Sequence, residues 1–209
     1  MAARLDHLTV VAPSLEVGAA YVEAALGVSP DAGRTHPGMG THNRLLALGP
    51  DVYLEVMSAD PQAPSVTRPR WFGLDHVSTG SAARLAAWVA STDHIAQAAS
   101  PELGDVETMH REHHTWQMTV RADGSLPLDG AAPLLIQRAS GVNPVAAMPQ
   151  RGLLLRALRI RHPAPSEVLA LFVRIAWVPH VEVTVTQADA CSLAAEIQTP
   201  LGFRMLGEA

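Results

Sequence analysis

The chain has 209 residues, a formal net charge of −5 and an apolar content of 48%, which suffices for one large domain or two small ones with a buried core. The acidic balance and the lack of any cluster of Lys and Arg argue against nucleic acid as a partner. The sequence has no recognisable signal segment, no apolar run of about 18 residues and only one cysteine, so we expect a cytoplasmic protein that does not enter membranes.

The first unit, residues 1–60, begins with a strand followed by a helix. Apolar residues in the segment 5–12 predict the strand, and a helical pattern over 15–26 follows Pro13-Ser14 and is closed by Gly27. A Gly/Pro-rich loop or short strand comes next. Two strand-like runs, 42–48 and 51–57, then predict a hairpin.

Two further units repeat this order of a strand before a helix. A connector at 61–83 leads to a second unit at 84–140, and a linker rich in small residues leads to a shorter third unit at 151–209. Within these units we predict the following elements: strands at 84–91, 115–122, 132–139, 153–161, 181–187 and 191–205, a short helix at 93–100, and a helix capped near Ser166. At an offset of 150 residues the first strand aligns with the last copy, where Ala157 replaces His7.

One face of the first unit collects polar side chains. If Gly49-Pro50 is a two-residue turn, Arg44 lies opposite Glu55, and His42 falls on the same face of the hairpin. Alternation along the first strand adds His7 to this face. An imidazole, a carboxylate and a guanidinium together suit a cleft better than a core.

His7 and Glu55 have two interpretations. A histidine and a carboxylate from neighbouring strands can each give one ligand to a divalent metal that activates oxygen-bearing substrates. They can equally form a hydrogen-bonded structural pair. The predicted contact between Arg44 and Glu55 argues against the metal, since a neutralised carboxylate is a poorer ligand.

The sequence resembles the vicinal oxygen chelate superfamily, and in particular its glyoxalase-like members. Three segments carry this resemblance: LDHLTVVAPSLEVGAAYVEAALGV at 5–28, HPGMGTHNRLLALG at 36–49 and VYLEV at 52–56. The resemblance implies an α+β fold in which repeated strand-helix-strand-strand-strand modules form curved mixed sheets around a cleft, with the helices outside. It also implies a divalent metal, Zn, Fe, Mn or Ni, held by a pair of side chains from each module, and His7 and Glu55 match the first pair.

The second pair departs from the family pattern. The first strand of the second unit offers no His, Gln or Glu, and its last strand offers only Gln137, which is either a neutral third ligand or a polar residue at a strand end. His110, His113 and His114 have the density for a metal site but equally suit a solvated loop. His36 and His42 flank a glycine-rich segment that either closes over a ligand or is a tight strand connection.

Two functions follow from this pattern. In the first, a metal on His7, Glu55 and Gln137 polarises oxygens of a small polar or anionic metabolite, with Glu55, His42 and Arg44 as catalytic residues; the resemblance implies lyase, isomerase or dioxygenase chemistry. In the second, the same face of a metal-free protein binds and sequesters a small molecule. The resemblance also leads us to expect a homodimer.

Overall fold

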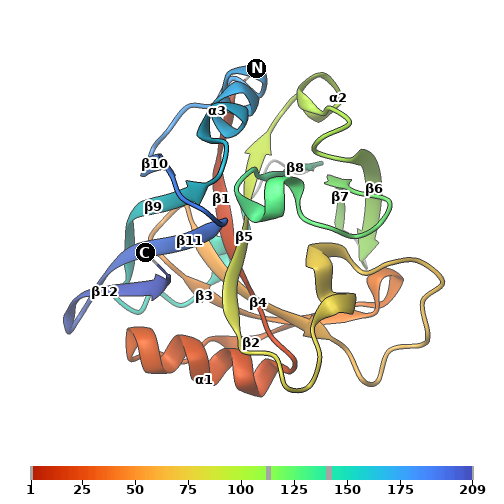
Figure 1. Cartoon of the computed structure of the whole chain (residues 1–209). Helices are drawn as coiled ribbons and strands as arrows, with labels where there is room; N and C mark the ends of the chain where they lie inside the picture. The colour runs from red at the N-terminus through yellow and green to blue at the C-terminus, as the bar shows by residue number, and fades with distance from the viewer. Residues whose placement is uncertain (1, 112–113, 140–142, 209) are drawn as a thin grey trace.

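The computed structural model describes residues 2–111, 114–139 and 143–208. Within these ranges the chain forms two sheets and three α-helices (Figure 1). The first eight-stranded sheet is built from β1 (Ala3–Val11), β2 (Asp31–His36), β3 (Thr41–Ala47), β4 (Tyr53–Ala59), β5 (Arg84–Thr92), β6 (Asp105–Arg111), β7 (His114–Val120) and β8 (Leu134–Arg138). The second sheet contains β9 (Leu154–His162), β10 (Glu182–Gln187), β11 (Ser192–Thr199) and β12 (Gly202–Gly207). The helices are α1 (Leu15–Leu26), α2 (Ile95–Ala98) and α3 (Pro165–Arg174).

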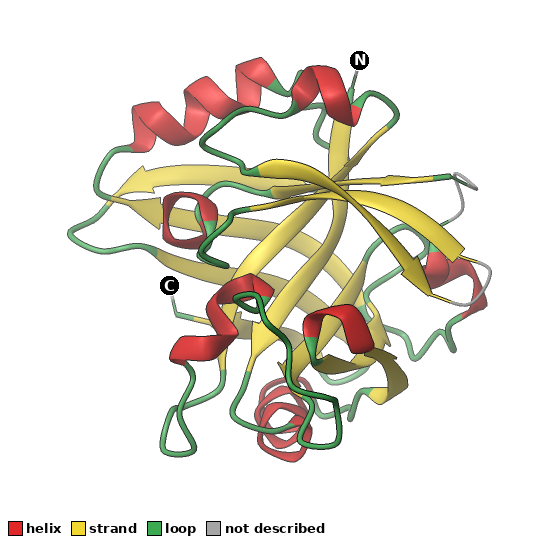
Figure 2. Ribbon diagram, turned by 90° about the vertical axis from the view of Figure 1, so that its right-hand side faces the viewer, coloured by secondary structure: helices red, strands yellow, loops and turns green. Residues whose placement is uncertain are grey.

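Two strand-helix-strand-strand-strand modules make the large sheet. Its strand order is β2-β3-β4-β1-β5-β8-β7-β6, so β1 and β5 pair antiparallel at the centre and each module extends outward from them. In both modules the last strand runs parallel to the first, β4 beside β1 and β8 beside β5. The sheet curls into a half-barrel (Figure 2), which confirms the predicted α+β fold with curved mixed sheets.

The third unit packs on the convex side of the half-barrel. Apolar side chains that point outward from β1, β4 and β5 share one core with α1, α3 and the four-stranded sheet. Trp88 is the largest of these buried side chains, and its indole N–H donates to the carbonyl of Ala131 at 3.1 Å. Because this side of the sheet is filled by packing, the concave side is left for a ligand.

Helix α1 shows how the sequence sets one of these packing contacts. The Ser14 hydroxyl accepts a hydrogen bond from the backbone N–H of Val17, and Gly27 ends the helix in the left-handed conformation, as the sequence pattern predicts. In its middle, Gly18 lies so close to β4 that an added Cβ would stand 2.3 Å from Cγ1 of Val56. Glycine at this position lets the helix approach the sheet.

Three sequence expectations differ from the structure. The predicted strand at 191–205 is two strands, β11 and β12, because Gly202 adopts φ +98° in the turn between them. The polar strand β6 was not predicted, and it lies at the sheet edge, where burial imposes no apolar alternation. Helix α3 begins after Ala164 without a side-chain cap, so Ser166 is not its cap.

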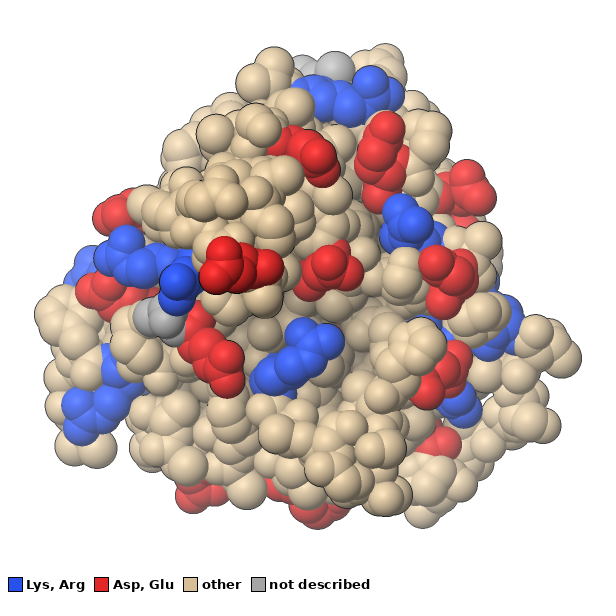
Figure 3. Space-filling view, viewed as in Figure 1, with Lys and Arg blue, Asp and Glu red and all other residues tan. Residues whose placement is uncertain are grey.

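Charge is spread over the molecular surface. Acidic and basic side chains are interspersed on the face seen in Figure 3. Among the described residues, no helix has the length and apolar character needed to cross a membrane.

Candidate functional site

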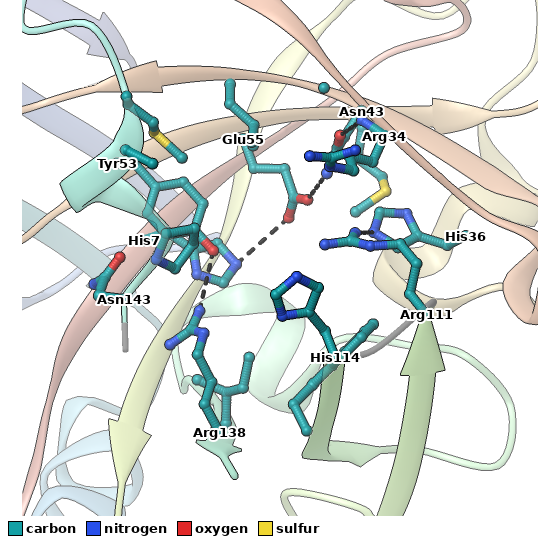
Figure 4. A pocket seen from close by; sticks show the side chains of 18 of the residues that line it. His7, Arg34, His36, Asn43, Tyr53, Glu55, Arg111, His114, Arg138 and Asn143 are labelled. Atoms are coloured by element: carbon teal, nitrogen blue, oxygen red, sulfur yellow. Dashed lines mark hydrogen bonds and ion pairs between the residues drawn. The ribbon is translucent and has the colours of Figure 1, made fainter. Parts of the chain in front are cut away.

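The concave side of the half-barrel encloses a cavity of about 680 Å³ (Figure 4). Both modules contribute to its wall, which is largely apolar and aromatic. The apolar lining residues are Leu45, Met57, Trp71, Phe72, Trp116, Met118, Ile136 and Met148. Polar and ionisable side chains gather at the floor and at one rim, so the cavity is a concave apolar site with a few convergent polar groups.

A β-bulge places Asp6 beside His7 at the floor. The pairing of β1 with β5 passes from Leu5–Ala90 to His7–Val89, which leaves Asp6 as an extra residue. The bulge brings together two neighbouring side chains that regular alternation would send to opposite faces. An oxygen of the Asp6 carboxylate lies 2.7 Å from Nδ1 of His7, and both residues are buried.

Glu55 faces the other nitrogen of the His7 ring. Its Oε2 lies 3.4 Å from Nε2 of His7, and its Oε1 accepts a hydrogen bond from the Asn43 amide at 2.5 Å. The Asn43 carbonyl oxygen in turn accepts from the backbone N–H of Arg34 at 2.6 Å, which fixes the orientation of the amide. Glu55 is therefore held by two strands of the first module.

The second module completes this network through Arg138. Its guanidinium donates to both oxygens of Asp6, at 2.5 and 2.8 Å, and to the Tyr53 hydroxyl at 3.2 Å. The Tyr53 ring stacks on His7 with a centroid separation of 4.5 Å. Asp6, His7, Glu55 and Arg138 thus form one buried ionic network, which we call the floor network.

The contacts within the floor network favour the charged form of every member. Burial alone would lower the pKa of His7, but hydrogen bonds to Asp6 and Glu55 raise it above 6.5. Burial would likewise raise the pKa values of both carboxyls, yet His7 holds both below their ordinary range, with help from Arg138 at Asp6 and from Asn43 at Glu55. Two carboxylates balance one imidazolium and one guanidinium.

The rim of the cavity carries further cationic and imidazole groups from the two edge strands. Arg111 on β6 donates to Nε2 of His36 on β2 at 3.3 Å, and its guanidinium lies 5.5 Å from the Trp116 ring centroid. Burial lowers the pKa of His36 to about 4, so this imidazole is neutral and can accept. Arg34 and His114 also line the cavity and are exposed (Figure 4).

The predicted contact between Arg44 and Glu55 is wrong. The backbone N–H of Leu48 donates to the carbonyl of Val52, so three residues rather than two separate the strands. Arg44 therefore pairs with Val56, and Leu45 takes the place opposite Glu55. A shift of one residue turns each side chain to the other face, so Arg44 and His42 point away from the cleft.

The structure does not bring Gln137 to the predicted metal ligands. Its side-chain oxygen accepts the backbone N–H of Ile95 at 2.9 Å, on the face opposite Arg138. The family pattern needs two ligands from β5 and β8. Among the described residues of these two strands, the side chains at the cleft are Arg138 and the apolar Ala87, Val89, Leu134 and Ile136.

The donor set therefore does not fit the four-ligand metal site that the resemblance implies. His7 and Glu55 come together, but their ligand atoms already have partners: Nδ1 of His7 contacts Asp6, and Glu55 contacts Nε2 of His7 and accepts from Asn43. Among the described residues, no group of three His, Cys, Asp or Glu side chains could hold a metal. His114 lines the cavity and His110 contacts the Thr115 hydroxyl at 3.3 Å, whereas His113 lies outside the described residues.

Three members of the site were missed from the sequence. Asp6 depends on a bulge that no local signal marks, and Asn43 and Arg138 are each one residue from a predicted candidate. With the correct hairpin register, Asn43 would have been predicted on the cleft face in place of His42 and Arg44. A basic residue next to Gln137 at a strand end was the available signal for Arg138.

Comparison with known proteins identifies a family and a shared fold. A family model described as a glyoxalase-like domain matches residues 5–176, which include both modules of the large sheet. Among solved structures, a hypothetical protein from Staphylococcus aureus is similar, with a TM-score of 0.61 and 12% sequence identity over 91% of this chain and 88% of that chain. At this identity the likeness shows a shared fold. No curated protein matches the sequence.

Proposed function

The chain belongs to the glyoxalase-like domain family of the vicinal oxygen chelate superfamily, and from this premise we propose that its cleft binds a small anionic metabolite with an apolar body. We further propose that His7 and Glu55 transfer a proton at this metabolite without a complete metal site. The observation that carries the proposal is the contact between the His7 imidazole and the Glu55 carboxylate at the floor of a cavity with apolar and aromatic walls.

The shape and lining of the cavity support the binding step. A volume of about 680 Å³ is within the usual range for small-molecule sites, and Trp71, Phe72 and Trp116 offer ring surfaces to an apolar group. Arg34 and His114 at the rim give an anionic group a favourable position. We therefore favour a ligand such as a 2-oxo acid with an aromatic or branched side chain.

The charges of the floor network support the proton-transfer step. The Glu55 carboxylate can remove a proton from a carbon next to a carbonyl group. Once Glu55 has taken this proton and become neutral, the Nε2–H of His7 that faced it can donate a hydrogen bond to the oxyanion that develops on the carbonyl. This is the stabilisation that a metal supplies when one is bound in this superfamily. Asp6 favours the charged imidazole and orients its ring, and Arg138 holds the Asp6 carboxylate in place.

Hydrogen exchange tests both steps. Phenylpyruvate is a suitable probe, and the exchange of its C3 protons for solvent deuterium can be followed by NMR with chelator-treated protein that carries no affinity tag. We expect the wild type to accelerate exchange and Glu55→Gln to lose about 100-fold or more of this acceleration. Glu196→Gln is the matched control, because Glu196 pairs with Arg159 on the second sheet, outside the cleft.

Each outcome separates the alternatives. Binding of phenylpyruvate without accelerated exchange would favour the metal-free binding protein. Exchange that Glu55→Gln leaves intact would remove Glu55 from the chemistry. Acceleration that requires an added divalent metal, and that is lost in His7→Ala, would favour the metalloenzyme, which has two of its four ligand positions filled by His7 and Glu55.

A further inference from the structure

A second cavity, of about 710 Å³, lies outside the cleft on the other side of strand β3. Its lining includes the two side chains that the sequence had placed in the cleft, His42 and Arg44. From β2 and β6 it also receives Arg34, His110 and Arg111. Three guanidinium groups and two imidazoles therefore surround one concavity, on a face where the proposed function uses neither His42 nor Arg44.

Two of these arginines have no anionic partner among the described residues. The other basic side chains near the cleft are neutralised, Arg138 by Asp6 and Arg68 by Glu107. By contrast, neither Arg34 nor Arg44 forms an ion pair within 4 Å of a described acidic group. Within this group of side chains, His42 does contact an acid, since its Nδ1 lies 3.9 Å from the Asp60 carboxylate.

Two buried side-chain nitrogens in this cavity also lack hydrogen-bond partners among the described residues. In the described part of the chain, the buried Nε of Arg44 has no hydrogen-bond acceptor and the buried Nε2 of His42 has no hydrogen-bond partner. A buried donor without an acceptor costs about 1–3 kcal/mol, so native sites of this kind usually hold an anion or a water molecule. A guanidinium presents two parallel donors, a geometry that matches a phosphate or a carboxylate.

We propose that this second cavity is a binding site for a phosphate group carried by a small metabolite. A dianion with several acceptor oxygens satisfies more than one guanidinium at once, whereas a monocarboxylate presents only two oxygens. The cavity is concave and the chain is acidic overall, which favours a small phosphorylated compound over a polyanion. Arg34 and Arg111 line both cavities, so the phosphate would lie beside the mouth of the cleft.

Titration with inorganic phosphate and with pyrophosphate, followed by calorimetry at constant low ionic strength, tests this site. Loss of one charge-assisted contact typically corresponds to about a tenfold weakening or more, so we expect Arg44→Gln and Arg34→Gln each to raise the dissociation constant by at least about tenfold. Arg156→Gln, an exposed substitution on the second sheet, is the matched control and should change nothing. If Arg44→Gln unfolds, His42→Gln is the second variant, because His42 lines this cavity and not the cleft.

The NMR signals of the arginine side chains show where phosphate binds. Phosphate should shift the Nε–H signals of Arg34 and Arg44 and leave that of Arg138 unchanged, because Asp6 occupies Arg138. No binding of either anion, or equal weakening by Arg44→Gln and Arg156→Gln, would overturn the proposal. This test does not use the cleft chemistry, so it can fail while proton transfer at Glu55 stands, and the reverse also holds.

Discussion

Removal of the Arg138 side-chain charge should destabilise the protein more than removal of any comparable surface charge. The Arg138 guanidinium donates to both carboxylate oxygens of Asp6, which is 1% exposed and lies in the bulge of β1. In Arg138→Met the aliphatic volume is largely kept, but Asp6 loses its guanidinium and Tyr53 loses a hydrogen-bond donor.

The magnitude follows from burial. Breaking a buried ion pair by removing one partner costs about 3–5 kcal/mol, because the remaining charge is left without compensation. Asp6 keeps its contact with His7 at 2.7 Å, so we expect the lower end, about 3 kcal/mol. Arg151→Met is the matched control, since Arg151 also pairs with an aspartate, Asp31, at 2.5 Å but with both side chains about 40% exposed. Such exposed pairs contribute about 0–1 kcal/mol.

Urea unfolding at neutral pH measures both costs, from the midpoint and the denaturant dependence of the free energy of unfolding. The reasoning requires a clearly larger loss for Arg138→Met than for Arg151→Met. Equal losses below about 1 kcal/mol would refute it, because Asp6 would then be solvated or compensated in a way that the buried floor network does not allow.

Two further substitutions test the packing and the rim. Gly18→Ala should lower the free energy of unfolding by about 1–3 kcal/mol, because the new Cβ would lie 2.3 Å from Val56 Cγ1, although Ala in a helix interior is normally favourable. Val56→Ala in the same chain should recover part of the loss. Gly38→Ala is the control and should be nearly neutral, because no atom lies within 4 Å of its added Cβ. His36 has a folded-state pKa of about 4 against 6.5 in the unfolded chain, so the unfolded state binds its proton first as the pH falls. Stability should therefore be unaffected by His36 above about pH 6.5 and should decline by about 3 kcal/mol between pH 6.5 and 4, a decline that unfolding curves of His36→Gln should lack.

The sequence predicted the repeated modules but not how the side chains meet across them. Apolar periodicity and turn residues located β1, α1 and the β3–β4 hairpin, because each of these elements packs an apolar face into the core. The edge strand β6 escaped detection, and β2 could be predicted only as a loop or a short strand, since an exposed strand needs no apolar alternation. The order of the buried elements could therefore be predicted, because burial of an apolar face leaves a periodic pattern in the sequence.

The composition of the site depends on finer geometry. His7 and Glu55 were predicted correctly to share a face, and the structure brings them to 3.4 Å. A third residue in the hairpin turn moved Arg44 and His42 to the other face, and a bulge turned Asp6 toward its neighbour. Both are single-residue features of the backbone, and each changes which side chains line the cleft.

The protonation of His7 tests the central claim, that the floor network provides an acid–base pair instead of a complete metal site. The measurement is the ¹⁵N NMR spectrum of the His7 ring at about pH 6, assigned by its loss in His7→Gln, before and after addition of one equivalent of zinc. We predict that both ring nitrogens carry protons, held by Asp6 and Glu55, and that zinc leaves them unchanged. A neutral ring whose Nε2 resonance moves on addition of zinc would contradict the account.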